Sequence, residues 1–192
     1  MVKQMKTAKK NQGFTLVEEL AVISIILFMV CIGAPAMSSM LNNNRQANQM
    51  NILANHLRMV RSAAVFDHKN MLICKSSDGQ FCDKKTDWNK GWITFHDSNN
   101  NKKRDPEEKV IISQGVLADN TKILYSSFGG SKNYVRYYSQ GYSHTNGTFV
   151  FCNPNGLEQT KAIIISKTGR IRTEENPSKK QKKKCSAYTQ ST

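Results

Sequence analysis

Two arginines placed one residue apart near the C-terminus have the side chains and the spacing to hold a phosphate group. They lie in the segment Gly169-Arg170-Ile171-Arg172, where the glycine permits a turn. An extended segment after that turn would point Arg170 and Arg172 to the same face. A guanidinium group binds phosphate through two parallel hydrogen bonds, which the ammonium group of lysine cannot do. The pattern predicts a phosphate clamp in which both arginines contact the phosphate groups of one ligand backbone.

The segment from residue 167 to the end of the sequence is strongly basic. It has eight basic residues against two acidic ones, a net charge of +6, in a chain whose total is +14. Such a cluster attracts polyanions, and DNA is the obvious candidate, through phosphate contacts and counterion release that need no base recognition. The alternative is that the arginines lie on a solvated edge strand and the lysines form a solubilising tail or a contact to an anionic surface. The predicted DNA-binding residues are Lys167, Gly169, Arg170, Arg172, Lys179, Lys180, Lys182, Lys183 and Lys184.

Four histidines are scattered along the chain, and no spacing of serine, histidine and acid stands out as catalytic. The sequence therefore predicts a protein that is not an enzyme and has no cofactor. Four tyrosines interleaved with Lys132 and Arg136 could stack on the bases of a single strand, although core and cross-strand packing explains such residues more often. These tyrosines are Tyr134, Tyr137, Tyr138 and Tyr142.

One stretch has oxygen-bearing side chains at the spacing of a twelve-residue calcium loop. The ligand positions hold Asp97, Asn99, Asn101, Asp105 and Glu108. Lys102 stands where such a loop needs glycine, three consecutive basic residues would oppose a cation, and strands rather than helices should flank the loop. The prediction is therefore a solvated hairpin loop with no metal.

The chain has five cysteines. Cys31 lies in an apolar segment and is expected to act as a small apolar residue. The other four should lie in an oxidising compartment, where disulfides persist, and they allow three pairings between which the sequence alone cannot choose. We favour Cys74 with Cys82, closing a short hairpin, and Cys152 with Cys185, attaching the tail to the sheet. A zinc site is the rival, but no C-x-x-C pair or nearby histidine supports it.

The N-terminus combines a basic leader with an apolar segment. Residues 1–13 have four lysines and no acid, so the leader should stay on the cytoplasmic side of a membrane. Residues 20–34 are uncharged and, joined to residues 14–17, give about 28 Å of helix, enough for one membrane span. Glu18 would cost about 2.5–3.5 kcal/mol inside hydrocarbon unless it finds a partner. An ordinary secretory signal is cleaved after its apolar run, whereas Gly13 precedes the run.

A second helical segment should follow this span. Pro35 is expected to kink or loosen the helix. Beyond it, apolar residues at three- and four-residue spacing predict an amphipathic helix that ends near Phe66. These residues are Met50, Leu53, Leu57, Val60 and Ala64. Arg58 and Arg61 lie on another face, which is either simply solvated or a functional patch.

The rest of the chain predicts strands separated by Gly, Asn, Asp and Ser clusters. The predicted strands are 71–74, 91–95, 110–113, 122–126, 134–138, 148–152 and 162–166. Asn146-Gly147 predicts a tight turn, since both residues tolerate positive φ. An α+β fold follows, in which an antiparallel sheet packs on one long N-terminal helix. The expected parts are a leader (1–13), a membrane and filament-core helix (14–37), an amphipathic half-helix (38–66), a β head (67–173) and a basic tail (174–192).

The segment around Gly13, Phe14 and Glu18 resembles the type IV prepilin signal. The resemblance implies that a prepilin peptidase cuts after Gly13 and methylates the new N-terminal Phe14. It also implies that Glu18 neutralises the N-terminal amine of a neighbouring subunit during filament assembly. Glu19 departs from the usual pattern, in which an apolar residue follows the glutamate.

Further motifs look like those of the GspH/FimT minor pilin family. They are Trp88, residues 91–97, an Asn-rich turn, residues 107–111, and Gly169-Arg170-Ile171-Arg172. The family implies a pilin fold, in which a head of antiparallel strands packs on the C-terminal half of the helix. In FimT-type pilins of transformable bacteria a Gly-Arg-x-Arg motif is implicated in DNA binding. The resemblance carries that role to Arg170 and Arg172.

Together these resemblances imply a single-pass inner-membrane prepilin of a Gram-negative-type cell, found later in the pilus, the periplasm or at the cell surface. Its partners would be DNA, other major and minor pilins and the prepilin peptidase, and its function would be DNA capture for natural transformation. The alternative is a structural, GspH-like pseudopilin of a type II secretion system, or a pilus-priming minor pilin, in which the basic tail contacts another protein.

Overall fold

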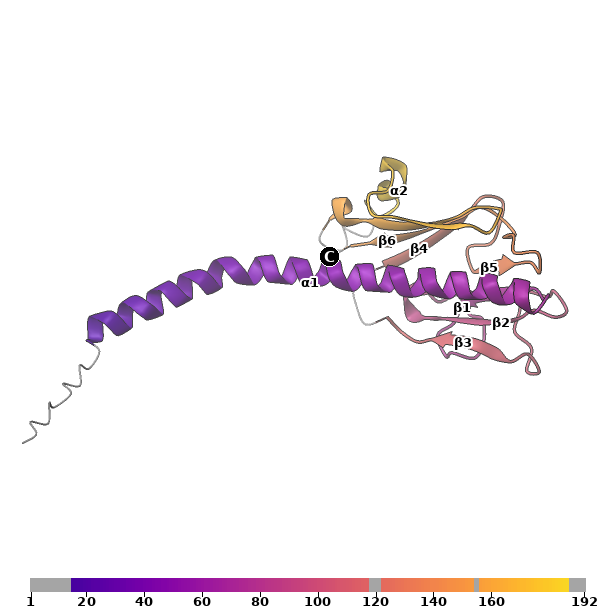
Figure 1. Ribbon diagram of the computed structural model, residues 1–192, viewed down its shortest axis with the longest axis horizontal. Helices are drawn as coiled ribbons and strands as arrows, with labels where there is room; N and C mark the ends of the chain where they lie inside the picture. The colour runs from indigo at the N-terminus through magenta and orange to yellow at the C-terminus, as the bar shows by residue number, and fades with distance from the viewer. Residues whose placement is uncertain (1–14, 118–121, 154–155, 187–192) are drawn as a thin grey trace, which may run out of the picture. The chain divides into compact units, whose positions relative to one another are not determined.

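The first element of the fold is one long helix. The computed structural model describes residues 15–117, 122–153 and 156–186, and its helix α1 is Leu16–Phe66 (Figure 1). The predicted end of this helix at Phe66 is confirmed. α1 continues through Pro35, so the loosening expected there does not end the helix. The chain divides after Met40 into two compact units.

In the first unit, large apolar side chains of α1 are open to solvent. Leu16 and Val17 are each 75% exposed, and Phe28 is 69% exposed. Continuous apolar surface of this kind is typical of a helix that is covered by protein or lipid. In the ranges that the structure describes, no helix is long and apolar enough to cross a membrane.

The second unit, Leu41–Thr192, is called the head below, and its described strands form two antiparallel sheets of four. The first sheet has the order β3-β2-β1-β5, with β1 Met71–Lys75, β2 Trp92–His96, β3 Val110–Gln114 and β5 Tyr134–Tyr137. The second sheet has the order β4-β6-β7-β8, with β4 Lys122–Ser127, β6 Gly147–Cys152, β7 Lys161–Ile165 and β8 Ile171–Glu174. The short helices are η1 Trp88–Lys90, η2 Leu157–Gln159 and α2 Lys179–Lys183.

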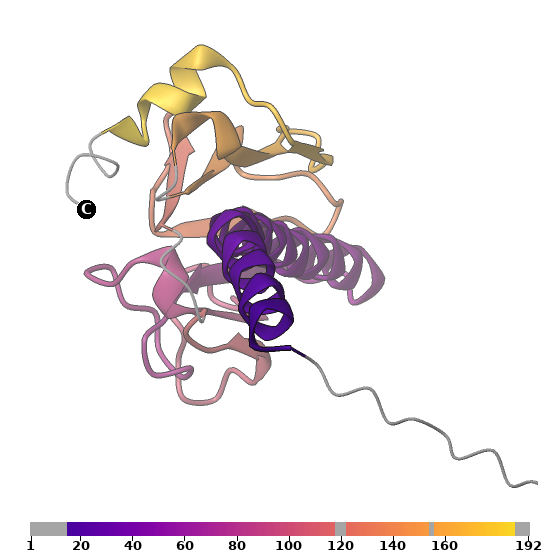
Figure 2. The ribbon, with the colours of Figure 1, turned by 90° about the vertical axis from the view of Figure 1, so that its left-hand side faces the viewer.

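The α+β fold class is confirmed, and each predicted strand overlaps one of β1 to β7, but the strands form two sheets rather than the one expected. β4 and β5 are consecutive in the chain, yet they belong to different sheets. Within the head, the two sheets lie on different sides of the helix (Figure 2). This arrangement is possible because the helix presents apolar side chains over an arc wide enough to cover one face of each sheet.

A single hydrophobic core joins the helix to both sheets. Leu53 and Leu57 of α1 are fully buried, as their spacing predicted. They belong to the same cluster as Trp92 and Tyr137 of the first sheet and Phe149 of the second. Burial of one large apolar side chain contributes about 1.5–3 kcal/mol. The core therefore fixes the two sheets relative to this part of the helix.

Both favoured disulfides are present, and each covers the outer face of one sheet. Cys74 and Cys82 have Cα atoms 5.6 Å apart, and Cys152 and Cys185 have Cα atoms 5.4 Å apart. Cys74 packs in a small apolar cluster of the first sheet, and Cys152 and Cys185 pack in one of the second. The second disulfide thus attaches the segment after α2 to β6. Cys31 is free and exposed.

The prediction of a tight turn at Asn146-Gly147 is wrong. Neither residue has a positive φ, and Gly147 is the first residue of β6. A Cβ at Gly147 would lie 2.2 Å from the hydroxyl oxygen of Tyr125, so glycine is needed for close packing. Asn146 instead joins two loops. Its backbone oxygen accepts a hydrogen bond from the N–H of Phe128 (3.0 Å), and its side-chain oxygen accepts one from the N–H of Lys167 (2.6 Å).

Candidate nucleic-acid interface

The turn between β7 and β8 positions the two arginines of the predicted clamp. Gly169 has a φ of +79°, and its N–H donates to the carbonyl oxygen of Ser166 at 2.8 Å. The N–H of Ser166 in turn donates to the carbonyl oxygen of Arg170 at 2.9 Å. A Cβ at position 169 would lie 2.0 Å from the carbonyl oxygen of Gly141, so a larger residue does not fit. The turn predicted at Gly169 is therefore present.

Arg170 and Arg172 are exposed on and after this turn. Arg170 precedes β8, and Arg172 lies within it, opposite Ile164 of β7. Among the residues that the structure describes, neither guanidinium group has a hydrogen-bond or ion-pair partner. Two positive charges are therefore available to a ligand from outside the chain.

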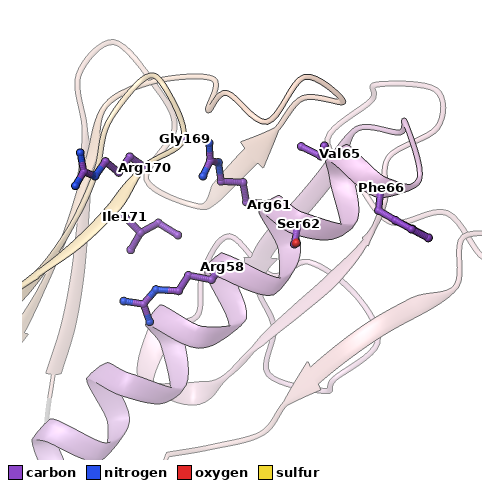
Figure 3. Close-up of a pocket in the computed structure, with 8 residues that line it drawn as sticks. All are labelled: Arg58, Arg61, Ser62, Val65, Phe66, Gly169, Arg170 and Ile171. Atoms are coloured by element: carbon purple, nitrogen blue, oxygen red, sulfur yellow. The ribbon is translucent and has the colours of Figure 1, made fainter.

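Arg170 lines a hollow of about 570 Å³ next to the C-terminal part of α1. Figure 3 shows Arg58, Arg61 and Arg170 around this first hollow, with Phe66 at the end of the helix. Arg61 Nε donates to the carbonyl oxygen of Gly141 at 2.8 Å. This hydrogen bond connects the helix to the loop between β5 and β6, against which the Gly169 turn packs. Three guanidinium groups therefore lie around one concave surface.

The sequence did not associate the helical arginines with the clamp. Their spacing of three residues placed Arg58 and Arg61 on one face of a helix. The sequence did not decide whether that face is simply solvated or is a functional patch. Only the packing of the second sheet on α1 brings them next to Arg170. No local pattern could have shown this, because more than a hundred residues separate them along the chain.

Arg172 lines a second hollow of about 450 Å³, together with Lys184 and Phe128. Lys184 Nζ donates to Ser126 Oγ at 2.6 Å. Burial lowers the pKa of Lys184, and the positive charges of Lys180 and Lys132 lower it further. Like charges are thus held close together here, which favours an anionic ligand.

The two arginines therefore line different hollows, whereas the sequence predicted one clamp on a single face. Arg170 belongs to the turn, where the alternation of a paired strand does not yet apply. Arg172 follows that alternation, since it lies inside β8. An extended polyanion would have to cross both hollows to contact both groups.

The predicted lysines are distributed around α2. Ser178 caps this helix in a capping box with Gln181, and the Cys152–Cys185 disulfide holds the chain directly after it. Lys182 forms an ion pair with Glu158 at 2.5 Å, so part of its charge is used within the head. The exposed lysines are Lys167, Lys179, Lys180, Lys183 and Lys184. The described part of the basic tail is thus folded against the second sheet.

The residues of the prepilin signal are only partly described. Gly13 and Phe14 lie outside the described residues. Glu18 and Glu19 are exposed in the first turn of α1, where a carboxylate interacts favourably with the positive end of the helix dipole. The N–H of Glu18 donates to the carbonyl oxygen of Thr15 at 3.0 Å.

The loop at residues 97–108 uses its oxygen atoms for its own structure. The Glu108 carboxylate accepts hydrogen bonds from the N–H groups of Ser98 (2.8 Å) and Asp105 (3.1 Å). Asp97 is buried and pairs with Arg136 of β5. In the described part of the chain, no group of three or more His, Cys, Asp or Glu side chains could hold a metal ion.

The tyrosines serve mainly in packing. Tyr137 is fully buried in the core, and Tyr134 packs on the outer cluster of the first sheet. The rings of Tyr138 and Tyr142 contact each other, with centroids 4.6 Å apart. Arg136, which sequence reasoning placed among them as a cation, is buried in its pair with Asp97.

A sequence model of the family described as Type II transport protein GspH matches residues 49–169. The matched range begins within α1 and ends at Gly169, and it contains β1 to β7. A comparison with curated protein sequences finds no match.

Two solved proteins share the fold. The type IV minor pilin FimU of Pseudomonas aeruginosa strain PAO1 matches with a TM-score of 0.51 and 19% identity, covering 68% of this chain and 89% of that chain. The minor pseudopilin EpsH from the type II secretion system of Vibrio cholerae matches with a TM-score of 0.50 and 8% identity, covering 68% of this chain and 97% of that chain. At these identities the likeness shows the fold alone.

Proposed function

This chain belongs to the GspH family of type IV minor pilins and pseudopilins, and we propose that within this family it binds extracellular DNA. Arg170 and Arg172 would contact backbone phosphates, and Lys167 and the lysines of α2 would strengthen the encounter. Binding of this kind needs no base recognition. DNA held in this way would enter the cell for natural transformation when a separate motor retracts the filament.

The observation that carries this proposal is the pair of exposed guanidinium groups of Arg170, just before β8, and Arg172, within it. In the ranges that the structure describes, neither has a partner. The turn beneath them is closely packed, since the backbone of Gly169 approaches that of Gly141 without room for a Cβ. A rigid turn fixes where the two side chains leave the backbone, so little backbone freedom is lost on binding.

The proposal includes the processing and assembly that the prepilin signal implies. Cleavage after Gly13, methylation of Phe14, anchoring in the inner membrane and pairing of Glu18 with a neighbour's amine would place the subunit in a filament. The exposed apolar side chains of α1 before residue 41 support this, because lipid or neighbouring subunits would cover them. The prepilin peptidase and other pilins are the partners expected.

The test measures binding of the full-length protein, in nonionic detergent, to a short DNA duplex at several salt concentrations. An Arg170→Gln/Arg172→Gln variant is expected to lose most of its affinity. The slope of log affinity against log salt should fall by about 2, because each phosphate contact contributes about 0.9. Folding of every variant is checked by circular dichroism.

The matched control is Lys84→Gln/Lys85→Gln, which removes the same charge from exposed positions close to Cys82. It should bind DNA nearly as well as the unaltered protein. The proposal is wrong if both double variants lose affinity equally, because net charge rather than a site would then explain binding.

The alternative function is that of a structural pseudopilin in a type II secretion system. The family's description and the fold shared with EpsH favour it. The basic surface would then contact another protein of the filament. Undetectable DNA binding by the folded protein at low salt would support this alternative over DNA capture.

A further inference from the structure

The second hollow combines positive charge with an exposed aromatic ring. Phe128 is 87% exposed, although it lines the same hollow as Arg172 and Lys184. A single exposed apolar residue is ordinary by itself. An exposed ring beside an arginine and a lysine is the combination used by proteins that bind single-stranded nucleic acid, where rings stack on bases and cations follow the backbone.

The backbone on both sides of Phe128 is held in place while its ring is left free. The N–H of Phe128 donates to the carbonyl oxygen of Asn146 at 3.0 Å, and its own carbonyl oxygen accepts a hydrogen bond from the Thr145 hydroxyl. Ser127 Oγ donates to the carbonyl oxygen of Ser131 at 3.0 Å, which closes the loop that follows β4. A ring on a fixed backbone loses little freedom when a planar group stacks on it.

The positive charges at and near this hollow come from three separate segments. Arg172 of β8 and Lys184 of the chain after α2 line the hollow, and Lys132, from the same loop as Phe128, lies close enough to Lys184 for its charge to act on it. Lys180 is likewise close enough to Lys184 for its positive charge to act on it. The Cys152–Cys185 disulfide fixes the residue next to Lys184, so this repulsion is maintained in the fold. An anionic ligand would relieve it.

We propose that this hollow binds single-stranded nucleic acid, with one base stacked on Phe128 and adjacent phosphates held by Arg172 and Lys184. The inference rests on the proposed DNA-binding function and adds the kind of strand that is preferred. In a duplex both faces of every internal base are already stacked on neighbours, so the ring gains nothing from a paired strand. An unpaired base offers a free face, and every base has one, so no sequence preference follows.

The experiment measures fluorescence anisotropy of a labelled single strand and of the same strand in a duplex, each titrated with the full-length protein in nonionic detergent. Phe128→Ala should weaken single-strand binding by about tenfold, which is the size expected for one lost base stack. Duplex binding should change by less than about twofold. Phe128→Tyr should bind the single strand about as tightly as the unaltered protein, because it keeps an aromatic ring.

The matched control is Phe81→Ala. Phe81 is also exposed, but its ring lies under the guanidinium group of Arg104 and lines neither the first nor the second hollow. This variant should bind both strands as the unaltered protein does. A Phe128→Trp variant adds a direct readout, since stacking of a base on the indole would quench its fluorescence with the single strand and not with the duplex.

The possible results separate this inference from the function on which it rests. If Phe128→Ala binds the single strand normally while Arg170→Gln/Arg172→Gln loses both ligands, the stacking site is wrong and DNA binding stands. If Phe128→Ala weakens both ligands equally, the ring is a general contact and the preference for a single strand is wrong. If the unaltered protein binds neither ligand at low salt, both proposals fail.

Discussion

The two sheets of the head share one plan but use their arginines differently. Each packs one face on α1 and has its other face covered by a segment attached through a disulfide. In the first sheet, Arg136 of β5 is buried in an ion pair with Asp97. In the second, Arg172 of β8 is exposed, and it has no partner among the described residues. A strand arginine is a candidate binding group only where the fold leaves it unpaired.

The segments that cover the two sheets show the same contrast. Over the first sheet, the carboxylate of Asp78 accepts hydrogen bonds from the N–H groups of Phe81 (2.9 Å) and Gln80 (2.8 Å), and these bonds lower its pKa. Over the second sheet, α2 and the residue after it carry a run of lysines. The segment over the second sheet therefore holds the denser group of lysines, although Lys182 is paired with Glu158 and exposed lysines such as Lys84 and Lys85 also lie near the first sheet. The second sheet is therefore the side that a polyanion would meet.

Removing Arg136 should have the largest effect on this comparison. Arg136→Ala leaves the Asp97 carboxylate buried and uncompensated, so the free energy of unfolding should fall by about 3–5 kcal/mol. Arg172→Ala should change it by less than about 0.5 kcal/mol, because the side chain is exposed and unpaired. Denaturant unfolding of both variants makes the measurement. Equal losses would show that the two arginines are not used differently.

Removing each disulfide in turn should have the next largest effect. Cys152→Ala/Cys185→Ala opens a loop with a sequence separation of 33 and should cost about 4 kcal/mol, whereas Cys74→Ala/Cys82→Ala opens one of 8 and should cost about 2.5 kcal/mol. Only the first should also weaken DNA binding, since it releases Lys184 from β6. Denaturation and DNA titration of both variants measure this. Unchanged DNA affinity without the Cys152–Cys185 bond would contradict the placement of the site.

The smallest expected effect is a dependence on pH at Lys184. Its lowered pKa means that the folded protein loses this proton before the unfolded chain does, whose lysine titrates near 10.5. Stability contributed by this group should therefore rise with pH between the lowered pKa and 10.5, because the unfolded state then binds more protons. DNA affinity should fall over the same interval.

A Lys184→Arg variant keeps its charge and serves as the comparison for this titration. On raising the pH, the unaltered protein should lose about threefold more affinity for DNA than the variant, as expected for one phosphate contact. Parallel titrations at matched ionic strength measure the difference. Identical pH profiles would show that Lys184 does not contribute to the site.

Much of the local structure was predictable because its causes are local. The spacing of Leu53 and Leu57 identified the buried face of α1, and the helix ends at the expected Phe66. Gly169 was recognised as a turn residue, and the turn needs its positive φ. Cysteine spacing left three pairings open, and the two favoured pairs are the ones present. The roles of Gly13, Phe14 and Glu18 in processing and assembly stay predictions.

Other features could not be read from neighbours in sequence. Asn146-Gly147 has the composition of a tight turn, but Gly147 packs under Tyr125 and Asn146 bridges to Phe128 and Lys167. The position of Arg136 in β5 did not indicate that its guanidinium group would form a buried ion pair with Asp97. These outcomes depend on contacts between segments far apart in the chain.

The sequence by itself determined the helix, the strands β1 to β7, the charge of the C-terminal segment and the side chains proposed to bind phosphate, because periodicity, turn chemistry and side-chain type act over a few residues. Only the tertiary structure decided that the strands divide into two sheets, that Arg170 and Arg172 line different hollows, and that Phe128 lies beside Arg172 and Lys184. The physical reason is that burial of both sheets on one helix selects which distant side chains are paired and which remain open.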